Sequence, residues 1–236
     1  MDHLSYSSVS TFAYCPRMWW LNYVRGVRTP SSPAQMYGTA VHTIIEGMMV
    51  GKPVDAVTAV KMAAAKNGVR GTSLKGFDIQ ATADDIMSIM EDPGVASVLA
   101  GIRVDPGNVE VLIEFEVPGV PHKVIGYIDA IQTDGVPLDI KTSAWDWDDD
   151  RAKNETQPMF YLRALNTGNE KFDHLVFVKN SLVPRAYVIR TEYPGFLERV
   201  DAMVLEAWEG MSRWMDPTIG PPVCGNEKCQ CRKIWV

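Results

Sequence analysis

A short apolar stretch of the chain carries three charged residues whose spacing points to chemistry. Residues 126–143 read GYIDAIQTDGVPLDIKTS, which places Asp129, Asp139 and Lys141 among isoleucines and a leucine. Alternate side chains of a β-strand point to the same side, so Asp139 and Lys141 share one face while Ile140 points to the other. Charge in such a setting is costly unless it is paired or binds a metal ion.

The turn between the two strands decides whether the aspartates meet. A two-residue turn would set Asp129 opposite Ile140, and its carboxylate would point away from that of Asp139. A three-residue loop from Thr133 to Gly135, with the glycine in the left-handed conformation, sets Asp129 opposite Asp139 instead. We predict this second register.

Paired carboxylates in this register predict a cation site. Two carboxylates about 5 Å apart across a strand pair repel each other strongly unless a divalent cation lies between them. Oxygen ligands, with the remaining positions filled by water and phosphate, are the usual environment of Mg²⁺ or Mn²⁺. Such an ion lowers the pKa of a bound water, and Lys141 would orient that water or neutralise negative charge developing on a phosphate. D-x-K alone is a weak motif, so a hairpin with a solvated charged face is the competing interpretation.

The elements that must position these residues form a mixed α/β pattern, read from hydrophobic periodicity and turn residues. The expected helices cover residues 7–23, 36–50, 54–66, 82–100, 155–165 and 194–214. The expected strands cover 109–117, the two strands of the hairpin, 175–179 and 185–190. Ser7 or Ser8 can cap the first helix, which must kink or break at Pro16. We expect one α/β domain over residues 1–236, with a mixed central sheet flanked by helices.

Two of these elements offer further ligands. The helix at 36–50 carries His42 one turn before Glu46. The strand at 109–117 alternates, with Glu110, Glu114 and Glu116 on one face. Because this strand precedes the hairpin, Glu114 could aim a third carboxylate at the metal, although a solvated strand face explains it equally well.

Composition places the chain among ordinary globular proteins, with 46% hydrophobic and 22% charged residues. No apolar run is long enough to span a bilayer, and the first ten residues lack the pattern of a signal peptide, so we expect a cytoplasmic protein. Four cysteines are then expected as metal ligands, reactive thiols or core residues. The formal net charge of -6 argues against a protein that coats nucleic acid, without excluding a local basic groove.

Five motifs together resemble the PD-(D/E)XK nuclease superfamily, in its RecB-like branch, which includes the CRISPR-adaptation exonucleases and the AddB nuclease domain. The motifs are SSVSTFAYCP near the start, GTAVH ending at His42, GYID ending at Asp129, LDIK with Asp139 and Lys141, and QPMFY with Gln157 and Tyr161. The resemblance implies a restriction-endonuclease-like fold and metal-dependent cleavage of DNA. It implies that the metal ligands are His42, Asp129, Asp139 and the carbonyl of Ile140, that Lys141 is catalytic, and that Gln157 and Tyr161 lie beside the active site.

The resemblance also implies a role for the four cysteines. In several relatives an opening cysteine and three near the C-terminus hold a four-iron, four-sulfur (4Fe-4S) cluster that joins the two chain ends. Here residues 1–28 and 216–236 would form this region, with Cys15, Cys224, Cys229 and Cys231 as ligands. The C-x4-C-x-C spacing departs from the C-x2-C and wider final gap more usual in the family. Zinc is the direct competitor, because four thiolates also make a closed structural zinc site.

The combined expectation is a metal-dependent exonuclease acting on single-stranded or frayed DNA ends. The alternatives are an end-trimming or structure-specific endonuclease in a recombination or CRISPR-adaptation complex, and a catalytically inactive iron-sulfur module that binds DNA ends. No G-x-x-x-x-G-K-[ST] phosphate loop occurs, so unwinding would come from a helicase or recombination partner. Phosphate contacts are expected from Arg17, Arg25 and Arg28, and base-stacking surfaces from Trp19, Trp20 and Tyr23.

Overall fold

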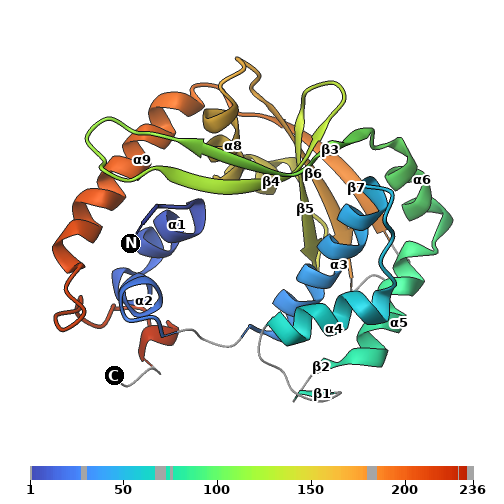
Figure 1. The fold of residues 1–236 in the computed structure, drawn as a ribbon, viewed down its shortest axis with the longest axis horizontal. Helices are drawn as coiled ribbons and strands as arrows, with labels where there is room; N and C mark the ends of the chain where they lie inside the picture. Colours follow the sequence, from blue (N-terminus) through green and yellow to red (C-terminus); the bar gives the residue numbers. More distant parts are fainter. Residues whose placement is uncertain are drawn as a thin grey trace.

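A five-stranded mixed sheet forms the centre of the molecule (Figure 1), in the order β3-β4-β5-β6-β7. The computed structural model describes residues 2–27, 31–66, 73–74, 77–179, 185–227 and 229–232. The strands of the sheet are β3 (Val104–Phe115), β4 (Val124–Gln132), β5 (Pro137–Ser143), β6 (Lys171–Val178) and β7 (Arg185–Glu192). Strands β5 and β6 run parallel and the other neighbours antiparallel, which confirms the predicted mixed sheet. A separate small sheet pairs β1 (Ser73–Leu74) with β2 (Phe77–Asp78).

Two groups of helices stand on either side of an opening below the sheet (Figure 1). One group holds α3 (Pro33–Met49), α4 (Ala56–Lys66), α5 (Ile79–Met90) and α6 (Pro93–Gly101). The other holds α1 (Tyr6–Tyr14), α2 (Pro16–Trp19), the π-helical turn η1 (Trp20–Val24), α9 (Phe196–Met211) and the 3₁₀ turns η2 (Ser212–Trp214) and η3 (Gln230–Arg232). The short helix α7 (Asp149–Asn154) and α8 (Gln157–Leu165) follow the hairpin. Within the described ranges, no helix has the length and apolar character needed to cross a membrane.

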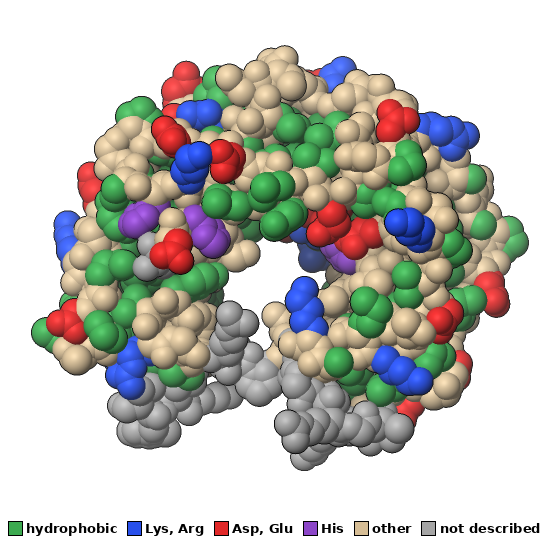
Figure 2. Space-filling view, in the orientation of Figure 1, with side chains coloured by type: hydrophobic (Ala, Val, Ile, Leu, Met, Phe, Trp, Pro, Cys, Tyr) green, Lys and Arg blue, Asp and Glu red, His purple; other side chains and the backbone are tan. Residues whose placement is uncertain are grey.

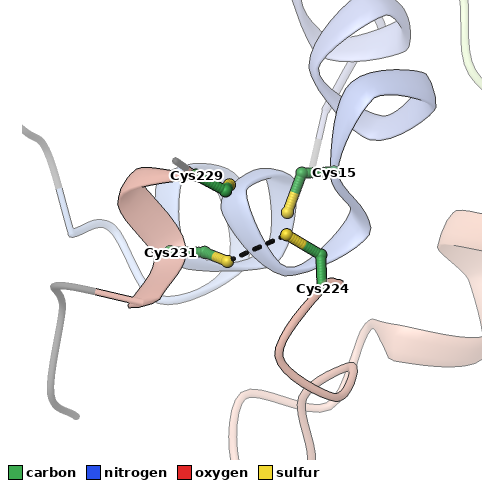
Figure 3. A group of neighbouring side chains, drawn as sticks. All are labelled: Cys15, Cys224, Cys229 and Cys231. Atoms are coloured by element: carbon green, nitrogen blue, oxygen red, sulfur yellow. Dashed lines mark hydrogen bonds between the residues drawn. The ribbon is translucent and has the colours of Figure 1, made fainter. Parts of the chain in front are cut away.

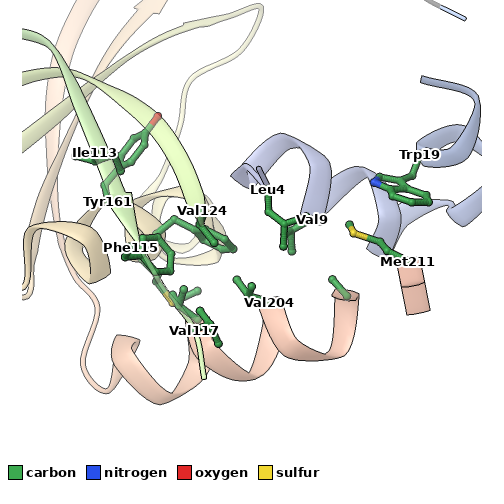
Figure 4. Packing of buried hydrophobic residues seen from close by; sticks show 14 of the residues in the cluster. Leu4, Val9, Trp19, Ile113, Phe115, Val117, Val124, Tyr161, Val204 and Met211 are labelled. Atoms are coloured by element: carbon green, nitrogen blue, oxygen red, sulfur yellow. The ribbon is translucent and has the colours of Figure 1, made fainter. Parts of the chain in front are cut away.

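Each group of helices buries its own apolar cluster against the sheet. In the first cluster, Leu4 and Val9 at the start of the chain pack with Val204 and Met211 of α9 and with β3, β4 and α8 (Figure 4). In the second, residues such as Ile44 of α3 pack on the β5 side chains that alternate with Asp139 and Lys141. The sheet is therefore held on both faces, which fixes the strands that carry the charged residues.

The N-terminal helix breaks at Cys15, as Pro16 predicts. Helix α1 ends before Cys15, whose backbone is extended, and α2 begins at Pro16 with the Cys15 sulfur accepting the Met18 N–H. Proline suits a first helical position because it lacks the N–H that would be unpaired there. The predicted cap was wrong, because Ser5 caps α1 through a reciprocal pair of hydrogen bonds with Ser8.

The helix expected at 82–100 is two helices. Helix α5 begins at Ile79 and ends at Met90, and α6 begins at Pro93. Between them Asp92 has an extended backbone and its carboxylate accepts the N–H groups of Gly94 and Val95. An aspartate N-cap followed by proline starts a new helix, and here it overrides the continuous apolar pattern.

The space-filling view shows a central opening with acidic side chains and a histidine gathered on its rim beside α3 and β3 (Figure 2). A cleft of about 730 Å³ lies in this region, lined by residues of α3 and by Glu110 of β3 and Thr142 of β5. The fold therefore brings one helix and two strands of the sheet to a single polar hollow.

Candidate active site

The hairpin adopts the register predicted from its loop. Ala130 pairs with Leu138 and Ile131 with Pro137, so the next position aligns Asp129 with Asp139. The loop has three residues, from Thr133 to Gly135, and Gly135 has φ +83°. Glycine tolerates this left-handed conformation without steric cost. The predicted three-residue loop is thus confirmed.

An ion pair between a buried aspartate and a half-exposed arginine holds the same loop in place. Asp173 of β6 is 2% exposed, and Arg190 of β7 binds both of its carboxylate oxygens at 2.8 Å. Arg190 also reaches Asp134 in the loop at 3.0 Å, and Gln132 donates to Asp173 at 2.8 Å. Two-pronged Arg–carboxylate contacts fix geometry as well as charge. The loop is therefore tied to β6 and β7, and these contacts stabilise the register that aligns Asp129 with Asp139.

Asp129 lies where β4 and β5 meet helix α3. It is 7% exposed, and its Oδ2 accepts the Ile140 N–H at 2.6 Å. The same oxygen lies 3.4 Å from His42 Nδ1. Asp129 of the sheet and His42 of the helix thus converge as two potential metal ligands.

Helix α3 supplies His42 and Glu46 to this point. Gly38, one turn before His42, packs so close to β5 that a Cβ there would lie 3.1 Å from Thr142 Oγ1. The glycine of the GTAVH motif therefore allows the close approach that carries His42 to the aspartate. His42 Nδ1 lies 3.5 Å from Glu46 Oε1.

The charge around His42 is strongly negative. Burial by itself would lower the pKa of His42, but its hydrogen bonds to Asp129 and Glu46 outweigh burial and raise that pKa to about 10. The imidazole is then protonated at neutral pH and brings a positive charge to the cluster. A bound metal ion would replace that proton, because only neutral histidine is a ligand.

Glu110 is a site residue that sequence reasoning missed. Its carboxyl group shares a hydrogen bond with Glu46, and lost solvation together with the charges of Glu46 and Asp129 raises the pKa of Glu110 to about 7. Glu110 has φ +53° at an irregular part of β3, where the register with β4 shifts. Non-glycine residues seldom adopt this conformation, and they do so chiefly at functional sites. The two-residue alternation used for the sequence cannot place such a side chain.

Glu114, which the sequence offered as a third metal carboxylate, lies elsewhere. Its carboxylate pairs with Lys123 Nζ at 2.6 Å, and both side chains are about half exposed. It belongs to the solvated face of β3, which was the competing interpretation. The carboxylates that join Asp129 come from Glu46 and Glu110 instead.

Lys141 connects the aspartates to helix α8. Its Nζ lies 2.7 Å from Asp139 Oδ2 and donates to Gln157 Oε1 at 2.7 Å, and Gln157 Nε2 donates to the Tyr161 hydroxyl at 2.6 Å. Burial by itself would lower the pKa of Lys141, but Asp139 outweighs burial and raises it, so the ammonium stays charged. Burial raises the pKa of Asp139 to about 6, against the opposing effect of Lys141. The structure thus brings Gln157 and Tyr161 beside the hairpin.

The donor set of the cleft suits a divalent cation. Ligand atoms of His42, Glu46 and Asp129 lie within 4.8 Å of one another. Asp139 lies outside this tight group, in its ion pair with Lys141, although its charge acts on His42. Carboxylate oxygens are the ligands preferred by Mg²⁺ and Mn²⁺. These residues therefore fit such an ion, with His42 and Asp129 as predicted and Glu46 as an addition.

The arginines expected to bind phosphate hold the C-terminal segment instead. Arg17 donates to the Pro221 carbonyl at 2.8 Å and Arg25 to the Pro217 carbonyl at 3.2 Å. Both guanidinium groups lie over the ring of Trp20, which is 4% exposed. Trp19 is fully buried, so both tryptophans belong to the core and only Tyr23 of the proposed stacking residues is exposed. Arg28 lies outside the described residues.

The four cysteines meet at one point, although they come from opposite ends of the chain (Figure 3). Cys15 stands between α1 and α2, while Cys224, Cys229 and Cys231 lie in the C-terminal segment. Three of the four are buried, and the Cys224 and Cys231 sulfurs are 3.4 Å apart. The predicted grouping of the cysteines is confirmed, and four thiols are a suitable ligand set for either an iron-sulfur cluster or zinc.

Comparisons with known proteins identify the family of the chain and support its fold. A model of the PD-(D/E)XK nuclease superfamily matches residues 3–234. A candidate exonuclease from Eubacterium rectale, at 16% identity, covers 100% of this chain and 89% of its own with a TM-score of 0.63, which shows a shared fold. The match to the structure of a protein named SSO0001 spans 78% of both chains at 18% identity, and its TM-score of 0.36 is too low to show a shared fold. No curated protein matches significantly. From the family match over nearly its whole length, the chain belongs to the PD-(D/E)XK nuclease superfamily.

Proposed function

We propose that this protein is a metal-dependent deoxyribonuclease that removes nucleotides from single-stranded or frayed DNA ends. The observation that carries the proposal is the meeting of His42, Glu46 and Asp129 beside the Asp139–Lys141 pair. His42 and Glu46 of this group line the polar cleft. Membership of a nuclease superfamily supports hydrolysis of a phosphodiester. The order of the GTAVH, GYID, LDIK and Q-x-x-x-Y motifs supports the RecB-like branch.

His42, Asp129 and Glu46, whose ligand atoms converge, would hold Mg²⁺ or Mn²⁺. The family resemblance adds Asp139 and the Ile140 carbonyl as further ligands. When bound, such an ion supplies an acidified water and stabilises charge on the phosphate. The Ile140 N–H keeps the Asp129 carboxylate oriented toward the helix. Glu110 has a pKa of about 7 and can exchange a proton at neutral pH at the edge of the cleft.

Lys141 acts as a positive charge and not as a base. Its ammonium is protonated at neutral pH because Asp139 lies 2.7 Å away. Negative charge developing on the phosphate would be stabilised by this ammonium. Gln157 holds the same group from the other side, and Tyr161 holds Gln157. The α8 residues thus help to hold the lysine ammonium beside Asp139.

Two features support a substrate with a free end. The cleft lies on the rim of the central opening (Figure 2), so a strand that enters the opening end first passes the carboxylates. Glu46 and Glu110 also line the cleft, together with the cation Lys66. The two carboxylates would repel the paired phosphates of a duplex more strongly than a single strand. A single strand presented by an unwinding partner satisfies both conditions.

The test compares linear and circular substrates of the same sequence. Purified protein with Mn²⁺ is incubated with end-labelled linear single-stranded DNA, with the circularised strand and with a blunt duplex. We expect progressive shortening of the linear strand and an intact circle. Cutting of the circle would support the endonuclease alternative, and binding without cleavage would support the DNA-end-binding module.

Substitutions assign the activity to this site. Asp129→Asn and Lys141→Met should each lower the cleavage rate by about 100-fold or more, since a ligand or a charge that stabilises the transition state is lost. Glu114→Gln is the matched control, because this exposed carboxylate on the same sheet pairs only with Lys123 among the described contacts. Undiminished cleavage by either site variant, with an unchanged circular dichroism spectrum, would refute the site assignment.

A further inference from the structure

The four-cysteine site has a size that distinguishes between its two candidate cofactors. All four sulfur atoms lie within 4.8 Å of one another, and those of Cys224 and Cys231 are 3.4 Å apart. Four thiolates around one zinc ion at about 2.3 Å stand about 3.8 Å from one another, by the geometry of a tetrahedron. In a four-iron cubane each thiolate binds a separate iron at an outer corner, so the sulfurs stand about 6.5 Å apart. The sulfur separations are those of a single ion.

We propose that Cys15, Cys224, Cys229 and Cys231 bind one tetrahedral metal ion of the zinc class, and not the 4Fe-4S cluster that the resemblance implies. This site is separate from the proposed nuclease centre and does not depend on it. Its role is to fasten the C-terminal segment to the break between α1 and α2 (Figure 3).

The spacing of the last two cysteines supports a small site. One residue separates Cys229 from Cys231, and both thiols are buried. The Cys229 N–H bonds to the Asn226 carbonyl at 3.0 Å, and the Arg232 N–H bonds to the Cys229 carbonyl at 3.2 Å. These tight turns hold the two thiols to one side of the ion.

Hydrogen bonds that involve no thiol fix the segment that carries the ligands. The Arg232 guanidinium donates twice to the Cys224 carbonyl, at 3.3 and 3.2 Å. Arg17 donates to the Pro221 carbonyl at 2.8 Å, and Asn226 donates to the Tyr14 hydroxyl at 3.2 Å. Opening the thiols to the separation of a cubane would require this segment to move outward and to stretch these bonds. The polypeptide contacts therefore favour the smaller cofactor.

Metal analysis of the full chain tests the proposal without any activity measurement. The protein is expressed with both iron and zinc supplied and is purified without oxygen, so that a cluster would survive. We expect about one zinc per chain, with iron and acid-labile sulfide close to zero. Cobalt exchanged into the same site should give the visible absorption bands of a tetrahedral thiolate complex. About four irons and four sulfides per chain, or a chain that retains no metal, would overturn the proposal.

Two variants separate this site from the nuclease centre. Asp129→Asn should keep its one zinc, because it alters only the carboxylate cluster. Cys231→Ser should lose zinc at least tenfold more readily to a chelator, because one of four thiolates is missing. If Cys231→Ser folds poorly, the metal and sulfide content of the unaltered chain still decides, since a cubane would bring about four irons and four sulfides and a single-ion site about one zinc. Loss of zinc from Asp129→Asn but not from Cys231→Ser would refute the assignment.

Discussion

Acid should destabilise this protein through His174, a buried histidine on β6 directly beside Asp139 in the sheet. The side chain is fully buried and its Nε2 lies 3.1 Å from the Tyr193 hydroxyl. Burial, with a further effect of the Lys141 charge, lowers the pKa of His174 to about 4. In the unfolded chain the imidazole takes up its proton near pH 6.5, while the buried imidazole stays neutral until about pH 4. Stability is therefore lost as the pH falls between these two values, and the loss from pH 7 to pH 5 is about 2 kcal/mol.

Urea unfolding at pH 7, 6 and 5, followed by tryptophan fluorescence, measures this loss. His174→Gln keeps a polar group for Tyr193 but cannot titrate, so its stability should fall by about 2 kcal/mol less than that of the unaltered chain. Other groups titrate equally in both proteins and cancel in the difference. His3→Gln is the matched control, because His3 is exposed. An equal loss of stability in the His174→Gln variant and the unaltered chain would refute the reasoning.

Three further substitutions test how the site is positioned. A Cβ at Gly38 would lie 3.1 Å from the Thr142 hydroxyl of β5, so the larger side chain of Gly38→Val should push α3 outward. Calorimetry should then show Mn²⁺ binding about tenfold weaker, and an unchanged affinity would contradict the close packing. Gln157→Leu removes a bond to Lys141 and should lower kcat several-fold with little change in KM, whereas a pure KM effect would show that Gln157 binds substrate instead. Arg190→Met removes the half-exposed ion-pair partner of the buried Asp173 and should lower the free energy of unfolding by about 1–3 kcal/mol in urea, and no measurable loss would argue against a stabilising ion pair.

The part of the site that depends on local rules was predictable from the sequence. Loop length and the glycine at position 135 fix the hairpin register, so the alignment of Asp129 with Asp139 follows from the order of the residues alone. Helical spacing placed His42 and Glu46 on one face of α3, and this pair was the available signal for Glu46 as a ligand. The mixed character of the sheet, though not its strand order, followed from the same pattern of strands and helices.

The parts that failed depend on non-local contacts or on irregular backbone. Glu110 reaches the cleft through a left-handed residue, whereas alternation placed Glu110 and Glu114 on one face and could not tell which of them approaches the site. Arg17 and Arg25 each donate to a carbonyl far away in the chain, in the segment after α9, which no local pattern reveals. Asp92 followed by Pro93 was a signal for the break between α5 and α6. The prediction of one helix over 82–100 missed it, because the apolar periodicity continues on both sides of the break.

The meeting of Cys15 with Cys231 imposes an order on how the protein is made. The first thiol leaves the ribosome before any strand of the sheet, and the last one emerges only after every strand has been synthesised. A ligand set divided in this way cannot be completed while the sheet is still being made, so a metal ion held by all four thiols would be bound only afterwards. A chain interrupted before Cys224 would lack this fastening, and its loose segments would be open to proteolysis.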